Sequence, residues 1–177
     1  MPSSRPSSPP AEAGGLVAFN DAPSEELSPV LHACCDVPSW VRAVLDGRPY
    51  RSREELLQRA DQAARRLTES EVDRALAAHP RIGERASGED TESAWSRSEQ
   101  SGVERDEDTA RKLTEANRAY EQRFGHVFLI CATGLGSGEV LSALESRLDN
   151  DQETERGVVA DELRKIALLR LERVLDT

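Results

Sequence analysis

Two short stretches hold most of the side chains that could do chemistry. Residues 78–84 contain His79 followed by a proline, and residues 94–100 contain Ser96 and Glu99. Because the unperturbed pKa of histidine is about 6.5, His79 can give or take a proton near neutral pH. The carboxylate of Glu99 can accept a hydrogen bond from a ligand or orient an imidazole. These residue types predict proton transfer to or from a small ligand that forms strong hydrogen bonds.

His79 is expected where a helix gives way to a loop. Pro80 disfavours the α conformation for the preceding residue, so the helical pattern of residues 70–78 should end there. The polar residues 81–92 include two glycines and indicate a loop that turns the chain back. Taken alone, a histidine at this position is also explained as a cation that complements the C-terminal end of a helix dipole.

The second stretch gathers polar groups on one helix face. If residues 91–101 are helical, Glu99 and Gln100 lie three and four positions after Ser96, and their side chains share a face. A hydroxyl, a carboxylate and an amide on one face suit a hydrogen-bonding ligand. The alternatives are a solvated surface acid at Glu99 and a core anchor at Trp95.

Composition limits the classes of fold and partner. The 177 residues carry a formal net charge of −10, with 32% charged and 4% aromatic residues. A core built from Leu, Val and Ala is typical of packed helices. The acidic balance argues against nucleic acid as a partner, because binding to phosphates needs clustered Lys and Arg. A local group of arginines can still bind a small anion inside an acidic protein.

The three cysteines are Cys34, Cys35 and Cys131, and their spacing predicts neither a metal site nor an even set of disulfides. The longest wholly apolar run, residues 127–132, is far shorter than the roughly 18 residues of a membrane span. The N-terminus shows no signal pattern. We therefore expect a soluble, cytoplasmic protein without a membrane partner.

The pattern predicts an all-α fold: a single-domain, compact bundle of about eight helices. Residues 1–15 are rich in Pro, Ser and Gly and are expected to form a disordered tail, which leaves residues 16–177 as the domain. The apolar run 127–132 fits either a strand or a buried helix, and we favour a helix because no second strand is evident. The other helices expected are 28–35, starting with Ser28 as N-cap, then 38–47, 52–67, 70–78, 91–101, 104–124, 137–148 and 153–175.

Four motifs in the chain order resemble those of the OHCU decarboxylase family, which acts on 2-oxo-4-hydroxy-4-carboxy-5-ureidoimidazoline (OHCU) in urate degradation. They are His-Pro-Arg-Ile-Gly at 79–83, Ser-Arg-Ser-Glu-Gln at 96–100, the segment 120–134 and Arg-Leu-Asp-Asn-Asp at 147–151. The resemblance covers about residues 16–175. One departure from the family pattern is Ser98, where a small apolar residue is expected.

The resemblance implies an all-helical homodimer that needs no cofactor or metal, and that converts its small anionic substrate to (S)-allantoin and CO2. By motif, the catalytic histidine falls on His79 and the catalytic glutamate on Glu99. The implied substrate contacts are Pro80, Ser96, Arg97, Ser98, Gln100, the backbone of Ile130, Cys131 and Ala132, and Arg147.

These residue types could carry out the chemistry that the resemblance implies. Loss of CO2 leaves electron density that the substrate ring can accept, so no metal or pyridoxal is required. Arg147, with Arg97, would orient the anion by charge-assisted hydrogen bonds. Glu99 would orient the substrate or His79, and a histidinium at His79 would protonate one face.

Two other functions remain open from the residues alone. One is a hydrolase or isomerase of a related ureido compound, using the same histidine and glutamate. The other is a noncatalytic helical interaction module in which His79 marks only a helix end.

Overall fold

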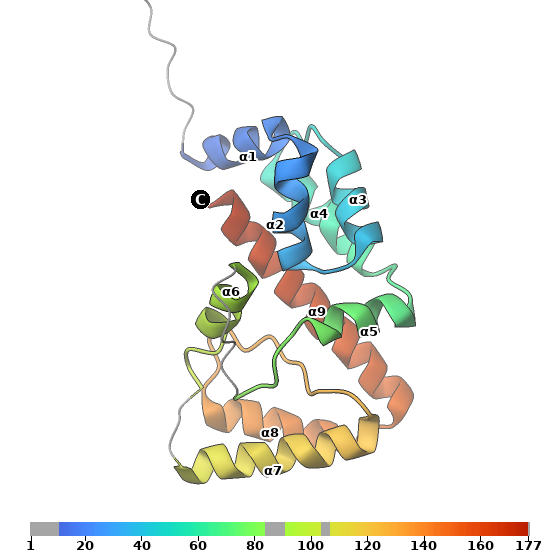
Figure 1. Cartoon of the computed structure of the whole chain (residues 1–177), viewed down its shortest axis with the longest axis vertical. Coiled ribbons are helices and arrows are strands. Elements are labelled where there is room, and N and C mark those ends of the chain that lie inside the picture. The colour runs from blue at the N-terminus through green and yellow to red at the C-terminus, as the bar shows by residue number, and fades with distance from the viewer. Residues whose placement is uncertain (1–10, 84–90, 104–106, 177) are drawn as a thin grey trace, which may run out of the picture.

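The structure is a computed structural model that describes residues 11–83, 91–103 and 107–176, and these residues form nine helices and no strand (Figure 1). The predicted all-α fold is confirmed. Across the described ranges, no helix is both long enough and apolar enough to span a membrane. The helices are α1 (Ala11–Asp21), α2 (Ser24–Cys34), α3 (Pro38–Asp46), α4 (Arg53–Ala64), α5 (Glu69–Ala77), α6 (Thr91–Glu99), α7 (Glu107–Phe124), α8 (Ser137–Arg147) and α9 (Gln152–Leu175).

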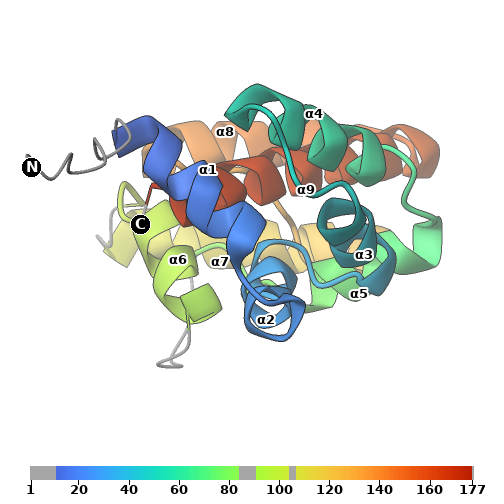
Figure 2. The ribbon, with the colours of Figure 1, turned by 90° about the horizontal axis from the view of Figure 1, so that it is seen from above.

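The C-terminal helix α9 is the centre of the packing. It contacts α1, α2, α4 and α5, and Figure 2 shows it running beneath α1 and α4 along the length of the molecule. Its buried face repeats at helical spacing and includes Val159, Leu163, Ile166 and Leu171. Because this stripe is broad, α9 can be covered from several sides at once.

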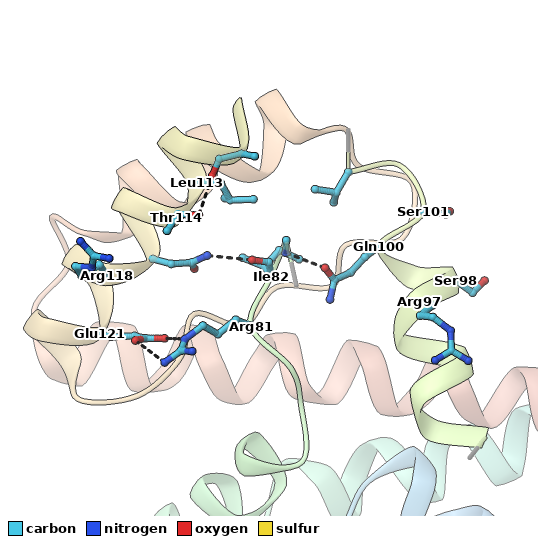
Figure 3. Close-up of a pocket in the computed structure, with 14 residues that line it drawn as sticks. Arg81, Ile82, Arg97, Ser98, Gln100, Ser101, Leu113, Thr114, Arg118 and Glu121 are labelled. Atoms are coloured by element: carbon cyan, nitrogen blue, oxygen red, sulfur yellow. Dashed lines mark hydrogen bonds and ion pairs between the residues drawn. The ribbon is translucent and has the colours of Figure 1, made fainter. Parts of the chain in front are cut away.

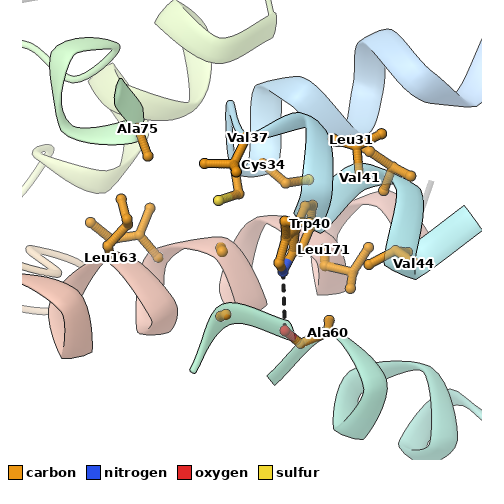
Figure 4. Packing of buried hydrophobic residues seen from close by; sticks show 14 of the residues in the cluster. Leu31, Cys34, Val37, Trp40, Val41, Val44, Ala60, Ala75, Leu163 and Leu171 are labelled. Carbon is orange, nitrogen blue, oxygen red and sulfur yellow. Dashed lines mark hydrogen bonds between the residues drawn. The ribbon is translucent and has the colours of Figure 1, made fainter. Parts of the chain in front are cut away.

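The buried apolar side chains fall into two clusters. The larger is built around α9 and the helices α2 to α5, with Trp40 donating from Nε1 to the carbonyl oxygen of Ala60 at 3.0 Å (Figure 4). The smaller lies between α7 and α8, which pack against each other, and includes Tyr120 and Phe128. The junction of the two clusters is where the candidate site lies.

Several helix boundaries differ from the sequence expectation. α1 begins at Ala11, inside the stretch for which we expected a disordered tail, and residues 1–10 lie outside the described residues. α2 begins at Ser24, so the predicted N-cap at Ser28 was wrong and Pro29 lies inside the helix. Pro29 is the sixth residue of α2 and lacks the N–H that would otherwise bond the carbonyl oxygen of Glu25. The predicted loop 81–92 and helix 104–124 each include residues outside the described ranges, 84–90 and 104–106.

The expected buried helix at residues 127–132 was wrong. This segment has no helical or strand assignment, although Phe128, Leu129 and Ala132 are buried. Side chains of other helices satisfy its backbone: the Cys131 N–H donates to Glu162 at 2.9 Å, and the Leu129 carbonyl accepts from Arg147 at 2.7 Å. An apolar run alone does not reveal such partners.

Truncation of the α9 stripe should reduce stability strongly. Leu171→Ala removes a side chain with no exposed area, so we expect the free energy of unfolding to fall by about 2–5 kcal/mol from lost burial and the cavity left behind. Val17→Ala is the control, because Val17 is 48% exposed and should change stability by less than about 0.5 kcal/mol. Urea denaturation measures both, and equal losses for the two variants would contradict the assignment of α9 as the core.

Candidate functional site

The two stretches singled out in the sequence meet in one small cavity. His79 and Pro80 come from the turn after α5, and Ser96 and Glu99 from the end of α6. The non-helical segment 128–132 forms the opposite wall. The residues that line the cavity are His79, Pro80, Ile82, Ser96, Glu99, Gln100, Phe128, Leu129, Ile130, Ala132 and Ile166.

A buried arginine on α9 fixes the orientation of Glu99. Arg170 donates from Nε to Oε1 of Glu99 at 2.8 Å and from Nη2 to Oε2 at 3.0 Å. Two parallel charge-assisted hydrogen bonds fix the plane of the Glu99 carboxylate relative to the plane of the Arg170 guanidinium. Nη2 also donates to Oγ of Ser96 at 3.1 Å. Both polar groups that α6 contributes to the cavity are therefore held by one side chain.

The same guanidinium reaches two further elements. Nη1 of Arg170 donates to the carbonyl oxygen of Ala33 at 2.9 Å, near the end of α2, and lies 3.6 Å from Oε1 of Glu92. Its charged group lies 5.9 Å from the centre of the Trp95 ring. The Arg170 side chain is completely buried, and this density of partners compensates for the loss of water around its charge.

Sequence reasoning missed Arg170. The available signal was its position: it falls in register with Leu163, Ile166 and Ala167 on the buried face of α9. An arginine within an apolar stripe requires a buried partner, because an unpaired charge there is costly. The partner, Glu99, is 71 positions away in the chain, so local spacing could not identify it.

His79 is uncharged in the free protein. Burial, and then the positive charge of Arg170, lower the pKa of His79 from 6.5 to about 3. The imidazole is therefore in its neutral form at neutral pH, and it can act as an acid only after it takes up a proton from the substrate or the solvent. The sequence analysis expected a histidinium at His79 as the proton donor. With this low pKa, the histidinium would have to form during the reaction.

Other predicted contact residues divide between this cavity and its surroundings. Ile130 and Ala132 line the cavity, while the backbone N–H of Cys131 donates to Glu162. Arg97 and Ser98 face a second, larger cavity. Gln100 lines both cavities.

Arg147 is bound within the smaller core cluster rather than at the cavity. Its Nε and Nη2 donate to Oε1 of Glu155, and its Nη1 donates to the carbonyl oxygen of Leu129. The guanidinium lies 4.4 Å from the centre of the Phe128 ring. Through these contacts Arg147 supports the wall that carries Phe128 and Leu129. A direct contact with substrate stays a prediction.

The larger cavity adjoins the His79 cavity and is shown in Figure 3. Its volume is about 870 Å³, against about 20 Å³ for the cavity that holds His79. Ile82 and Gln100 line both, and Oε1 of Gln100 accepts a hydrogen bond from the N–H of Gly83 at 2.9 Å. The larger space is thus separated from His79 by the Ile82 and Gln100 side chains.

In the ranges that the structure describes, no three His, Cys, Asp or Glu side chains are grouped so that they could hold a metal ion. The polar groups present, an imidazole, a carboxylate, a hydroxyl and an amide, suit hydrogen bonding to a small organic molecule.

Comparison with known proteins gives consistent matches. The sequence profile of the family described as OHCU decarboxylase matches residues 20–172. A 2-oxo-4-hydroxy-4-carboxy-5-ureidoimidazoline decarboxylase of Amia calva is 29% identical over 154 residues, covering 85% of this chain and 86% of the relative. The enzyme of the same name from Haloferax volcanii is 31% identical over 139 residues, covering 75% of this chain and 79% of the relative.

Further matches are longer proteins or solved structures. This chain spans only 32% of the uric acid degradation bifunctional protein of Bacillus sp. (strain TB-90), with 25% identity over 163 residues. A crystal structure of OHCU decarboxylase in the presence of (S)-allantoin has the same fold, with a TM-score of 0.72, 24% identity, and coverage of 88% of this chain and 100% of that chain.

The low pKa of His79 can be tested by NMR. We expect the imidazole resonances of His79 to stay those of the neutral form from pH 8 to pH 5, because the pKa of the buried ring is about 3. The spectrum of His79→Gln assigns the resonances. A titration midpoint near 6.5 would contradict the assignment.

The low pKa of His79 also predicts how stability depends on pH. The free energy of unfolding should fall as pH falls from 6.5 towards 3, since only the unfolded chain then takes up this proton.

Proposed function

The chain belongs to the OHCU decarboxylase family, and on that premise we propose that it removes CO2 from OHCU and forms (S)-allantoin in urate degradation. The observation that best supports this activity is the cavity in which a neutral imidazole faces a carboxylate held by Arg170. Such a cavity can move protons on a small polar ring. The two relatives named after this reaction align over most of this chain.

The substrate supplies its own electron sink. In OHCU the ring carbon C4 carries a hydroxyl and a carboxylate, and the neighbouring carbon C5 forms a C=N bond. When the bond from C4 to the carboxylate breaks, CO2 leaves, the electron pair forms a C4=C5 bond, and the ring nitrogen takes up a proton. The protein then needs to supply orientation and proton transfer, and we expect it to need no cofactor.

We assign the second proton transfer to His79. After CO2 leaves, neutral His79 takes the proton of the C4 hydroxyl, which becomes the carbonyl of allantoin, and delivers a proton to C5. Because the substrate enters as a carboxylate, each turnover consumes one proton from solvent. Delivery from one side only would set a single configuration at C5, since the ring is planar there before protonation.

Glu99 is proposed as the residue that orients the substrate. Its two oxygens accept hydrogen bonds from Arg170, which fixes the direction in which the remaining lone pairs point. An acceptor held in this way can receive the hydrogen of the C4 hydroxyl or of a ureido N–H. The Oγ of Ser96, held by the same arginine, would bind the substrate alongside it.

The proposal extends to the location and assembly of the protein. We propose a cytoplasmic protein, which is supported by three free cysteines, two of them buried. We also propose a homodimer, which is supported by the resemblance to the family.

Substitution of His79 tests the proposed mechanism. With OHCU generated freshly from urate, circular dichroism follows the optically active allantoin as it forms. His79→Ala should lower kcat by about 10²- to 10⁴-fold, which is the usual contribution of a placed general acid or base. His32→Ala is the matched control, because His32 lies 3.0 Å from Asp36 and does not line the cavity. It should retain full activity.

Two results would contradict the proposal. A folded His79→Ala variant with near wild-type kcat would exclude His79 from proton transfer. Wild-type protein that consumes OHCU without releasing CO2 would instead indicate a hydrolase or isomerase. Folding of each variant is checked by its far-ultraviolet spectrum.

A further inference from the structure

The larger cavity has properties that decarboxylation at His79 leaves unexplained. It has about forty times the volume of the His79 cavity, about 870 against about 20 Å³. Neither His79 nor Glu99 lines it. Its walls come instead from α6, α7 and the segment that leads from His79 to Gly83 (Figure 3).

The charge of this cavity is opposite to that of the chain. Among the described residues that line it, three are arginines, Arg81, Arg97 and Arg118, and one is an acid, Glu121. Arg81 donates to Glu121 from Nε at 2.5 Å and from Nη2 at 3.2 Å, so these two charges offset each other. The part of the lining that the structure describes is then positive overall, whereas the whole chain has a formal charge of −10. A positive pocket in an acidic protein selects for anions and concentrates them locally.

Arg118 is the arginine best placed to meet a ligand. It is exposed on α7, on the face that carries the lining residues Thr114, Asn117 and Glu121. Its side chain forms no hydrogen bond or ion pair with any residue that the structure describes. The hydroxyl of Thr114 and the amides of Asn117 and Gln100 add hydrogen-bonding groups to the same cavity.

The cavity also adjoins the place where the chemistry would occur. Ile82 and Gln100 line both cavities. The carbonyl oxygen of Ile82 accepts a hydrogen bond from Asn117 at 3.0 Å, and the side chain of Gln100 is bonded to Gly83. A ligand in the larger cavity is therefore separated from His79 by a wall of two side chains.

We propose that the larger cavity is a separate anion-binding antechamber, in which Arg118 captures the carboxylate of a ureido acid before the substrate passes Ile82 and Gln100 to His79. This inference rests on the proposed decarboxylation. The carboxylate is the group that the reaction removes, so the product is neutral and loses the attraction to Arg118. The antechamber thus favours entry of substrate over return of product.

Steady-state kinetics of Arg118→Gln test the capture step. We expect KM for OHCU to rise about 3- to 10-fold, as for loss of one partly solvated charge interaction. The kcat should stay within about twofold, because binding before the chemical step affects KM alone. Arg118→Lys keeps the charge and should restore most of the affinity. The kcat/KM of the wild type should fall more steeply with added NaCl than that of Arg118→Gln.

Lys112→Gln is the matched control. Lys112 lies on the same helix and is exposed, and its Nζ is 3.4 Å from Asp108, but it does not line the cavity. Its substitution removes one positive charge from α7, as Arg118→Gln does. Unchanged KM in Lys112→Gln supports a local site at Arg118. Equal increases in the two variants would show a general charge effect and overturn the proposal.

Binding of hydantoate, a stable ureido carboxylate, tests the antechamber without turnover. Isothermal titration should show weaker binding to Arg118→Gln than to wild type and to Lys112→Gln. If this pattern appears but the wild type does not decarboxylate OHCU, the anion site at Arg118 stands, while the proposed function and the passage of its substrate to His79 fail. If the wild type decarboxylates OHCU and Arg118→Gln changes neither KM nor hydantoate affinity, the antechamber is excluded and the proposed function stands. Absence of hydantoate binding to the wild type would also overturn the antechamber proposal.

Discussion

The buried pair of Arg170 and Glu99 is the interaction on which the candidate site depends. It connects the central helix α9 to α6, and the same guanidinium binds the end of α2. Removal of one member of a buried pair leaves an uncompensated charge, which typically costs about 3–5 kcal/mol. The position of α6 and the direction of the Glu99 carboxylate therefore depend on one side chain on α9, whose charge also adds to the effect of burial in lowering the pKa of His79.

The surrounding structure places this pair where two cores meet. Leu129 and Ile166 of the cavity belong to the larger cluster, and Ile82, Phe128 and Ala132 to the smaller. An irregular segment can line a buried cavity only if its backbone polar groups have partners. Here Glu162 and Arg147 supply those partners from α9 and α8. Hydrogen bonds from Arg170, Glu162 and Arg147 therefore fix both walls of the site. Packing within the two apolar clusters in turn fixes these charged side chains.

Local patterns were sufficient to predict most of the fold and to bring part of the candidate site together. Helical periodicity and the proline after His79 identified the helices and the turn. The i, i+3 spacing of Ser96 and Glu99 correctly placed both on the cavity side of α6. The segment 127–132 and Arg170 were missed because each depends on partners distant in sequence. The protonation state of His79 also depends on burial and on Arg170, which no local pattern contains.

The central claim is that this cavity delivers a proton to one face of the decarboxylated ring. The most direct measurement is the configuration and deuterium content of allantoin formed from OHCU in D₂O. The account predicts the (S) enantiomer with deuterium at C5, formed faster than in a protein-free blank. Racemic allantoin formed at the rate of the blank would contradict it, because protonation in achiral solvent has no preferred face.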